Sequence, residues 1–448
     1  MASKWEKLGG ERGQSVDTSR LGRAFKLGKM ATRLAGSMLT SQIGKRSEEE
    51  KAQALADAAL KQADRIVDVM GQMKGAAMKI GQLLSSDPDL IAPEFADQLS
   101  RLQQEAPPLD YKTVVAQLEA ALDQPIDAVF RFFDPEPLGS ASIGQVHRGT
   151  LHDGRQVAVK VQYPGVAASL ESDLKNLGSL LKVGRVFMTR EQADGFLDEA
   201  RKAILQEADY LAEAQNLLEF RGLFADWPDI RIPEPYLELC RPTVLTMEFV
   251  EGRKLDEALL DIEDRAERSR IATRLVEVFV YMVHDLHRLH ADPHPGNFML
   301  TPDHRLVLLD FGCIKGFDPV MADGILDLLV AFWADDWVAM ETHFRRLGFG
   351  KEGGSFPAHD VMRAYHRLIL EPLLEDAPFT MSNWKVHGRA RQFMFKNMSM
   401  VKLIPPPDLL LYFRVLAGMK GLMTKADVDV NIRRAAEDAC RRRGRLPA

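Results

Sequence analysis

The sequence predicts an α+β fold, and three observations support this prediction. Residues 137–165 have the pattern of three consecutive strands, and residues 230–238 and 243–248 have that of two further extended segments. Residues 255–290, and most of the chain after residue 320, instead have apolar side chains at helical intervals. A chain of 448 residues is long enough for one large protein with two lobes.

The composition argues against several classes of protein. Hydrophobic residues make up 46% of the chain and charged residues 27%, as in globular proteins. The formal net charge of −6 argues against a general nucleic-acid binder. The three cysteines, Cys240, Cys313 and Cys440, form no metal-binding or disulfide pattern, which indicates a reducing compartment. There is no secretory signal and no apolar stretch as long as a membrane span, so we expect a cytoplasmic protein without a transmembrane helix.

Residues 1–45 are expected to be a disordered and then basic N-terminal segment. Apolar side chains in residues 19–39 alternate with five basic ones, which are Arg20, Arg23, Lys26, Lys29 and Arg33. This pattern predicts an amphipathic helix that lies peripherally on an anionic membrane surface. The alternative is a helix that packs on the domain and exposes a basic face. Mitochondrial targeting also stays open, although the acidic residues Glu6, Glu11 and Asp17 count against a transit peptide.

Residues 46–106 are expected to form a helical extension. Apolar residues recur at helical intervals between residues 48 and 82, and the small residues of MKGAAMKIGQ allow another backbone to approach closely. Lys79 and Gln82 are three residues apart and therefore share one face of this helix. The pair Pro107-Pro108 marks the end of the extension.

The stretch PLGSASIGQVHRGTLHDGRQVAVK supplies the three predicted strands. We expect a loop of small residues at Gly139–Ile143 and a hairpin turn at His152–Gly154. The third strand, residues 156–161, carries Lys160 in the motif VAVK. In a kinase this strand position holds the lysine that contacts the α and β phosphates of ATP.

Residues 167–222 are expected to be mostly helical, and they supply candidate partners for Lys160. These candidates are Glu207, Asp209 and Glu213. Glu207 and Glu213 are six residues apart, so they cannot lie close together on one helix face and should have different partners. The extended segment 243–248 leads into MEFVEG, where the backbone of Glu248 and Val250 matches a hinge that would hold an adenine.

Residues 290–312, HADPHPGNFMLTPDHRLVLLDFG, contain the predicted catalytic centre. Asp292 begins a stiff loop, Asn297 follows five residues later, and a short hairpin brings Asp310 to the same end. Two acids and one amide suit Mg²⁺ bound to phosphates better than they suit zinc. An Asp, an Asn after four residues, a hairpin and then Asp-Phe-Gly is also the spacing of a kinase catalytic centre.

The chain after Gly312 differs from that of a typical protein kinase. It contains no Ala-Pro-Glu motif and no long activation segment. Apolar helices are expected directly afterwards, at residues 320–332, 337–347 and 361–370. We interpret the basic tail CRRRGRLPA as a frayed helix end rather than a binding site.

Six motifs in this order resemble the UbiB (AarF/ABC-one) family of atypical kinase-like proteins. They are KIGQ at 79–82, SASIGQVH at 140–147, VAVK at 157–160, EAD at 207–209, ADPHPGNF at 291–298 and LDFG at 309–312. The resemblance implies a protein-kinase-like two-lobed fold, with an N-terminal helical extension packed over the nucleotide cleft. It also implies binding of ATP and Mg²⁺, membrane-associated action and a link to ubiquinone or related isoprenoid lipids.

The resemblance also implies roles for particular residues. Lys79 and Gln82 match the motif that folds over the cleft, and Glu207 and Asp209 match the acidic pair expected to meet Lys79. Ala141 and Ser142 lie in the stretch that matches the nucleotide loop, where Gly139-Ser140 interrupts the usual run of alanines. Lys160 matches the phosphate-contacting lysine and Glu213 matches its helix partner. Asp292 matches the catalytic Asp, and Asn297 and Asp310 match the metal ligands.

The sequence therefore predicts a division into four parts and leaves three functions open. The parts are the segment 1–45, the extension 46–106, an N-lobe with a helical insertion at 107–252 and a mostly helical C-lobe at 253–448. The favoured function is an ATPase or a phosphotransferase that acts on a small lipid-like molecule. The alternatives are a nucleotide-dependent pseudokinase that organises lipid-biosynthesis enzymes and, less favoured, a true protein kinase.

Overall fold

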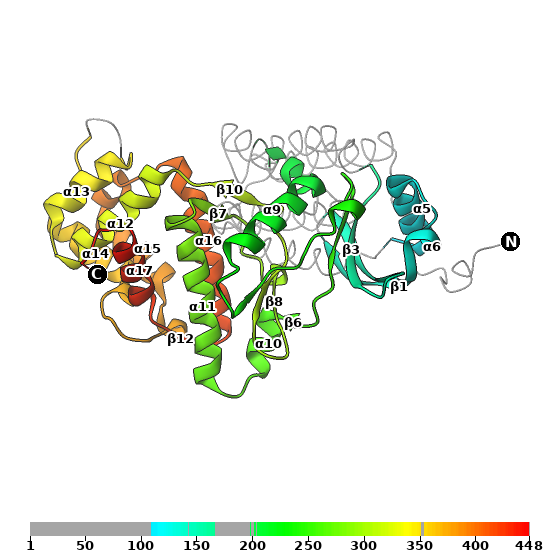
Figure 1. Cartoon of the computed structure of the whole chain (residues 1–448). Coiled ribbons are helices and arrows are strands. Elements are labelled where there is room, and N and C mark those ends of the chain that lie inside the picture. Colours follow the sequence, from blue (N-terminus) through cyan, green and yellow to red (C-terminus); the bar gives the residue numbers. More distant parts are fainter. Residues whose placement is uncertain are drawn as a thin grey trace, which may run out of the picture. The chain divides into compact units, whose positions relative to one another are not determined.

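The computed structural model describes residues 109–165 apart from Ser142, residues 198, 201 and 202, and residues 204–350 and 354–447. The chain divides into two compact units (Figure 1). The described residues of the first unit extend to Glu219 and include Pro233–Val250, and the second unit comprises Phe220–Ile232 and Glu251 onward. The predicted N-terminal segment and helical extension, with Lys79 and Gln82, lie outside the described residues, so the four-part division stays a prediction.

The first unit is built on an antiparallel sheet with the strand order β1-β2-β3-β5. Its described elements are α5 (Tyr111–Leu122), α6 (Ile126–Val129), β1 (Phe130–Ala141), β2 (Gly144–Leu151), β3 (Gln156–Gln162), most of α9 (Tyr210–Leu223), η1 (Leu237–Leu239) and β5 (Val244–Glu248). Strand β3 is buried on both faces, because Val157, Val159 and Val161 are each 0% exposed and Lys160 is 4% exposed. The side chain of Asp110 caps α5 by accepting a hydrogen bond from the Thr113 amide at 3.0 Å.

The second unit is mostly helical and contains short strands around the catalytic loop. The elements up to residue 316 are β4 (Ile230–Arg231), β6 (Arg253–Lys254), α10 (Leu255–Asp261), α11 (Arg265–His284), β7 (Arg288–His290), η2 (Pro295–Asn297), β8 (Phe298–Leu300), β9 (Leu306–Leu308) and β10 (Ile314–Gly316). These strands form a sheet of order β4-β9-β8-β6 and the separate pair β7-β10. The predicted hairpin is confirmed, because Phe298 pairs with Leu308 and Leu300 with Leu306.

Helices make up most of the remainder of this unit. They are α12 (Pro319–Trp333), α13 (Trp337–Arg346), α14 (His359–Ile369), η3 (Glu371–Leu373), η4 (Met381–Asn383), α15 (Val386–Lys396), η5 (Met398–Lys402), α16 (Pro407–Lys425) and α17 (Ile432–Arg442), and the short strands β11 (Phe379–Thr380) and β12 (Asp429–Val430) pair with each other. The three apolar helices predicted after Gly312 are α12, α13 and α14. Phe332, Trp337, Phe344 and Met362 pack together in one core cluster of these helices.

Two predicted boundaries among the strands are wrong. The first strand begins at Phe130 rather than near residue 137, and it reaches Ala141, which pairs with Gly144. The expected loop Gly139–Ile143 is therefore only a tight turn. The segment 230–238 is not one strand, because Ile230–Arg231 pairs with β9 and the chain then changes direction. Pro233 and Pro235 have no N–H to donate, so beyond Arg231 the segment makes only an isolated bridge with β5, between Pro235 and Met247.

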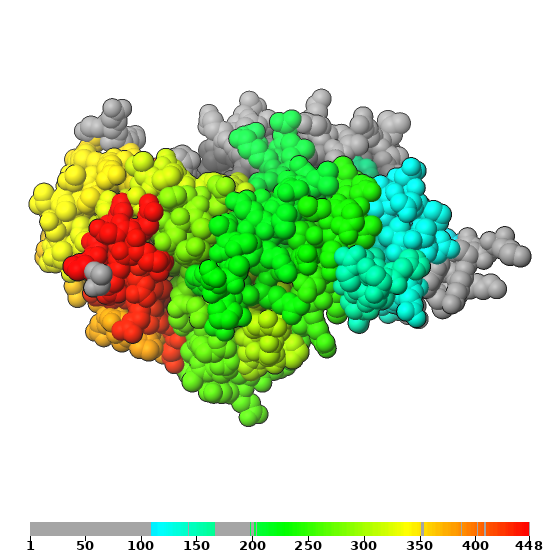
Figure 2. Space-filling view, viewed as in Figure 1, coloured from blue at the N-terminus to red at the C-terminus, as the bar shows by residue number. Residues whose placement is uncertain are grey.

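The interpretation of the basic tail as a frayed end is also wrong. Arg442 forms an ion pair with Asp285 at 2.9 Å, Arg443 with Asp323 at 3.1 Å, and Arg445 with Asp323 at 2.8 Å. Figure 2 shows α17, in red, bordered by yellow and orange surface of the same unit. The tail is thus docked by carboxylates that are more than a hundred residues away in the chain, which no local pattern reveals.

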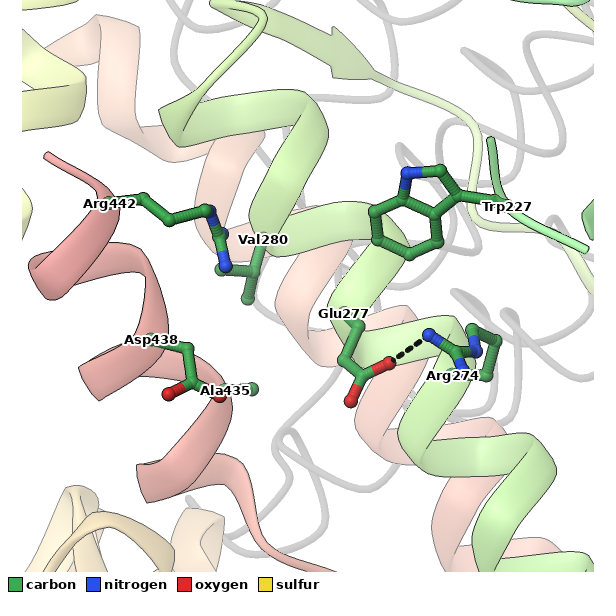
Figure 3. A pocket seen from close by; sticks show the side chains of 7 residues that line it. All are labelled: Trp227, Arg274, Glu277, Val280, Ala435, Asp438 and Arg442. Atoms are coloured by element: carbon green, nitrogen blue, oxygen red, sulfur yellow. Dashed lines mark hydrogen bonds and ion pairs between the residues drawn. The ribbon is translucent and has the colours of Figure 1, made fainter. Parts of the chain in front are cut away.

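The pocket drawn in Figure 3 lies in this unit between α11 and α17 and has a volume of about 220 Å³. Glu277 points toward Arg274, and their side chains form an ion pair at 2.7 Å. Arg274 also pairs with Asp229 at 2.9 Å, and Arg442 pairs with Asp285. Because its arginines are already paired with carboxylates, we assign these side chains a structural role in holding α17 on α11.

A buried histidine in this unit predicts how stability depends on pH. His284 is 3% exposed, and its Nδ1–H donates to the Ala322 carbonyl at 3.0 Å. Burial lowers the pKa of His284 from 6.5 to about 4. Between pH 6.5 and pH 4 only the unfolded chain binds this proton. The contribution of His284 to the free energy of unfolding is therefore fully present above pH 6.5 and is lost as the pH decreases toward 4. This histidine is expected to account for up to about 3 kcal/mol of that loss.

The measurement is the free energy of unfolding of wild type and His284→Gln, by urea denaturation between pH 7 and pH 4. The variant should be less stable at pH 7 and should lose less stability on acidification. His152→Gln serves as the control, because His152 is an exposed histidine of the first unit. Equal losses in wild type and His284→Gln would contradict the assignment.

Candidate active site

The catalytic loop in the second unit is held by hydrogen bonds at both ends. Strand β7 pairs with β10, and the Ala291 N–H donates to the Cys313 carbonyl at 2.8 Å. The loop then makes the single 3-10 turn η2, and the Leu309 N–H donates to the Asn297 carbonyl at 3.0 Å. These bonds join the loop that begins at Asp292 to the segment that carries Asp310, although the two lie in different parts of the sequence.

The three predicted acid and amide residues are brought together by this loop. Asn297 donates from Nδ2 to the backbone carbonyl of Asp292 at 3.0 Å. The amide nitrogen is therefore occupied, and the amide oxygen of Asn297 is the atom that a cation could bind. Asp310 accepts the Gly312 N–H at 2.9 Å, which orients its carboxylate. The side chains of all three residues are partly exposed, as a site for a ligand requires.

His290 lies behind this group and connects its two segments. Its Nε2–H donates to the Asp310 carbonyl at 2.7 Å, which identifies the tautomer because a carbonyl can only accept. The ring is 1% exposed and contacts Phe279, Phe298 and Phe311. Phe311 in turn packs on Phe220 with a centroid distance of 4.9 Å. His290 is thus a buried positioning residue, a role that the sequence did not reveal.

In the first unit, the predicted ion pair between Lys160 and Glu213 is confirmed. Lys160 Nζ lies 3.0 Å and 2.9 Å from the two carboxylate oxygens of Glu213. Lys160 is 4% exposed and Glu213 is 1% exposed, and the ammonium also lies 4.9 Å from the ring centroid of Tyr210. A lysine buried in this way needs a carboxylate partner, because an unpaired charge inside a protein is very unfavourable.

Glu207 and Asp209 occupy different environments before helix α9. Glu207 is 6% exposed, and the Gln162 side chain donates to the carbonyl of the neighbouring residue Ala208 at 3.2 Å. Asp209 is exposed and caps α9, because its carboxylate accepts the Ala212 N–H at 3.0 Å. The prediction that these two acids meet Lys79 stays a prediction, since Lys79 lies outside the described residues.

The turn between β1 and β2 explains part of the predicted nucleotide loop. Ala141 ends β1, and Ser142 lies outside the described residues. Gly144 begins β2, where an added Cβ would lie 2.4 Å from the Val161 carbonyl oxygen and 2.8 Å from the Tyr210 hydroxyl. Glycine is required there by close packing, which the sequence could not reveal because Val161 and Tyr210 are distant in the chain.

Gln145 and His147 form a buried hydrogen-bonded chain whose role the sequence did not reveal. Gln145 accepts the Leu109 N–H at 2.8 Å and donates to His147 Nε2 at 2.8 Å, and His147 Nδ1–H donates to the Asp134 carbonyl at 2.9 Å. Both side chains are 0% exposed, and burial lowers the pKa of His147, consistent with a neutral ring. This chain of bonds ties the start of the described N-terminal region to β1 and β2.

The predicted hinge follows β5. The Glu248 N–H donates to the Glu234 carbonyl at 2.8 Å, and the Phe249 N–H donates to the Gln156 carbonyl at 3.0 Å. The Glu248 N–H is therefore occupied, which leaves the Glu248 carbonyl and the backbone of Val250 as the candidates for adenine. Val250, at the end of this segment, is 6% exposed.

Helix α16 packs closely on the catalytic loop. An added Cβ at Gly418 would lie 2.7 Å from the Pro293 ring, so this position also requires glycine. Elsewhere on its surface α16 exposes three large apolar side chains: Leu410 at 56%, Phe413 at 43% and Leu416 at 42%. The sequence predicted a mostly helical C-lobe but not this contact with the loop.

These features define a protein of the kinase-like class: an antiparallel sheet with a buried lysine–glutamate pair, and a helical unit with an Asp, Asn and Asp-Phe-Gly centre. Comparison with known proteins agrees. The family model of the ABC1 atypical kinase-like domain matches residues 101–344, and this chain belongs to that family, the UbiB/AarF family. The predicted resemblance and the kinase-like fold are therefore confirmed.

Individual relatives extend this comparison. The chain is 33% identical over 432 residues to the mitochondrial atypical kinase coq-8 of Caenorhabditis elegans, which covers 93% of this chain and 57% of the relative. It is 31% identical over 374 residues to a probable protein kinase UbiB of Pseudomonas putida, covering 79% of this chain and 66% of the relative. The chain thus spans about half to two-thirds of the length of these curated relatives.

One solved structure has a similar fold. It is the complex of Rv3197 from Mycobacterium tuberculosis with erythromycin, at a TM-score of 0.60 and 28% sequence identity. The match covers 87% of this chain and 98% of the other. In the part of the chain that the structure describes, no helix is long and apolar enough to cross a membrane.

Proposed function

We propose that this protein is an atypical kinase that binds ATP with Mg²⁺ and transfers phosphate to water or to a small lipid-like acceptor. The observation that supports this most is the bond from Asn297 Nδ2 to the Asp292 carbonyl, which leaves the amide oxygen of Asn297 for a cation on a loop that the Leu309 N–H joins to the segment of Asp310. Such an oxygen-rich group fits Mg²⁺, which binds oxygen ligands and keeps phosphates as further ligands. Mg²⁺ held by Asn297 and Asp310 would offset the negative charge of the phosphates.

The other residues would bind and orient the reactants. Lys160, kept in place by Glu213, would contact the α and β phosphates. The Glu248 carbonyl and the backbone of Val250 would hold the adenine ring. Ala141 and Ser142 would line the nucleotide loop. Asp292 would accept the proton of an acceptor hydroxyl or position a water molecule for attack.

The exposed side chains of α16 support an apolar acceptor. Leu410, Phe413 and Leu416 are on the helix whose Gly418 contacts the loop of Asp292 and Pro293. A polyisoprenoid tail could lie along these side chains. This agrees with the family resemblance, from which we propose a role in ubiquinone or related isoprenoid-lipid metabolism.

The test is phosphate release from Mg-ATP by the pure full-length protein, with and without anionic liposomes and isoprenoid-phenol analogues. Asp292→Asn should lower release by about 10²–10⁴-fold while Mg-ATP still binds, because a general base is lost and the metal ligands remain. Asp303→Asn on the adjacent hairpin is the matched control. Phe413→Ser should reduce stimulation by an isoprenoid phenol more than it reduces release without one.

One outcome would favour the alternative function. If wild type binds Mg-ATP but releases no phosphate under any of these conditions, the protein acts as a nucleotide-dependent pseudokinase that organises other lipid-biosynthesis enzymes. A true protein kinase is less favoured, because the sequence has no Ala-Pro-Glu motif after Gly312.

A further inference from the structure

The end of helix α15 exposes an unusual pair of apolar side chains. Phe395 is 69% exposed and Met398, at the start of η5, is 66% exposed. The guanidinium of Arg391 lies 5.7 Å from the centroid of the Phe395 ring, and Lys396 is exposed beside it. We call Arg391, Phe395, Lys396 and Met398 the α15 patch.

The exposure of this patch is not a consequence of loose packing. The neighbouring side chains of the same turn are anchored: Phe393 contacts the ring of Tyr365 at 5.7 Å, and the Tyr365 hydroxyl donates to the sulfur of Met394 at 3.8 Å. Met400, in the following 3-10 helix, is 3% exposed. One face of this segment is therefore already packed on the unit, and the apolar side chains of the patch lie on the other face.

The stretch of sequence that contains the patch carries basic but no acidic residues. Between residues 385 and 406 there are five basic residues and no Asp or Glu, although the whole chain has a net charge of −6. The five are Lys385, Arg389, Arg391, Lys396 and Lys402. Arg389 forms an ion pair with Glu371 at 2.5 Å, and Lys402 donates to the Ser355 hydroxyl at 3.0 Å. Lys396 and Arg391 remain next to the two exposed apolar side chains.

We propose that the α15 patch docks on the surface of an anionic lipid bilayer. Phe395 and Met398 would enter the boundary between headgroups and acyl chains, and Arg391 and Lys396 would bind lipid phosphates. Phenylalanine, methionine and arginine also occur in protein interfaces, so the choice of a bilayer rests on the exposed Lys396 and on the absence of acidic residues between residues 385 and 406. This surface is separate from the basic segment 19–39, and the proposed phosphate transfer does not require it.

The first experiment measures co-sedimentation of the full-length protein with vesicles of phosphatidylcholine, with and without phosphatidylglycerol. Phe395→Ser combined with Met398→Ser should weaken binding to the anionic vesicles about tenfold, because two apolar side chains no longer insert. The double variant Arg391→Gln with Lys396→Gln should also bind the anionic vesicles more weakly than wild type. Its binding should depend less on the salt concentration. Val338→Ser is the matched control, because Val338 is 68% exposed on α13, and its binding should equal that of wild type.

The second experiment places an environment-sensitive fluorophore on the patch. The three native cysteines are buried, so Met398→Cys can be labelled selectively in the folded protein. Anionic vesicles should shift the emission of this label to the blue, and a label at Val338→Cys should not respond. If the label at residue 398 does not respond and the patch variants bind vesicles like wild type, the patch serves another partner and the proposal is overturned. Loss of Mg-ATP binding in the patch variants would show misfolding. In that case the emission of the label at residue 398 is the measurement that tests the proposal.

Discussion

Asp310→Asn is expected to abolish the thermal stabilisation of this protein by Mg-ATP. Two residues, Asn297 and Asp310, are proposed to hold the cation, and of these only Asp310 is an acid. Its carboxylate is oriented by the Gly312 N–H. Asn can still accept that hydrogen bond, so the loop should keep its structure while the metal loses its charged ligand. A ligand at one hundred times its dissociation constant stabilises a protein by about 2.7 kcal/mol, which is readily seen as a shift in melting temperature.

The measurement is thermal unfolding of both proteins with ATP alone, Mg²⁺ alone and both together. Asp318→Asn is the matched control, because Asp318 caps α12 by accepting the Val320 N–H and Asn is an equally good cap. The control should be stabilised by Mg-ATP as much as wild type. If Asp310→Asn is stabilised equally, the assignment of Asp310 to the metal is wrong.

Lys160→Met is expected to lower the free energy of unfolding by about 3–5 kcal/mol, as well as to impair nucleotide binding. The substitution leaves the carboxylate of Glu213 charged and 1% exposed, with its ammonium partner removed. Replacing both members by apolar residues removes the unpaired charge. The double variant Lys160→Met with Glu213→Leu should therefore be more stable than Lys160→Met alone.

Urea denaturation of the two single variants and the double variant gives the coupling energy between these residues. Lys112→Met, on the exposed face of α5, is the control and should change stability by less than about 0.5 kcal/mol. A cost below about 1 kcal/mol for Lys160→Met would mean that the pair is weakly coupled or hydrated. The double variant should still fail to bind ATP productively, which separates the functional from the structural role of Lys160.

Several features of the site could be predicted from the sequence because they depend on short spacings. Asp292, Asn297 and Asp310 are joined by a stiff Pro-Gly loop and one hairpin, and a hairpin returns the chain to its starting point whatever surrounds it. The helices after Gly312 follow from the period of their apolar residues. The pairing of Lys160 with Glu213, fifty-three residues apart, came from the family resemblance, because the residues themselves left Glu207, Asp209 and Glu213 as candidates.

Other features were decided by contacts between distant parts of the chain. The sequence motif containing Gln145 and His147 gave no role for either residue, because their partners, Leu109 and Asp134, are identified only by the packing of β1 and β2. Likewise, Gly144 and Gly418 are required by Val161, Tyr210 and Pro293, which lie elsewhere in the chain.

The sequence by itself therefore determined the kinase-like class, through its motifs and their resemblance to a known family, and it determined the catalytic loop and the candidate metal ligands through local turns. Only the tertiary structure decided where the strands end, how the basic tail is bound and which apolar side chains stay exposed. Arg442, for instance, has a charge that any sequence reader can see, but its partner Asp285 lies 157 residues away. Likewise Phe393 and Phe395 are chemically identical, and only packing against Tyr365 buries part of one while the other faces outward.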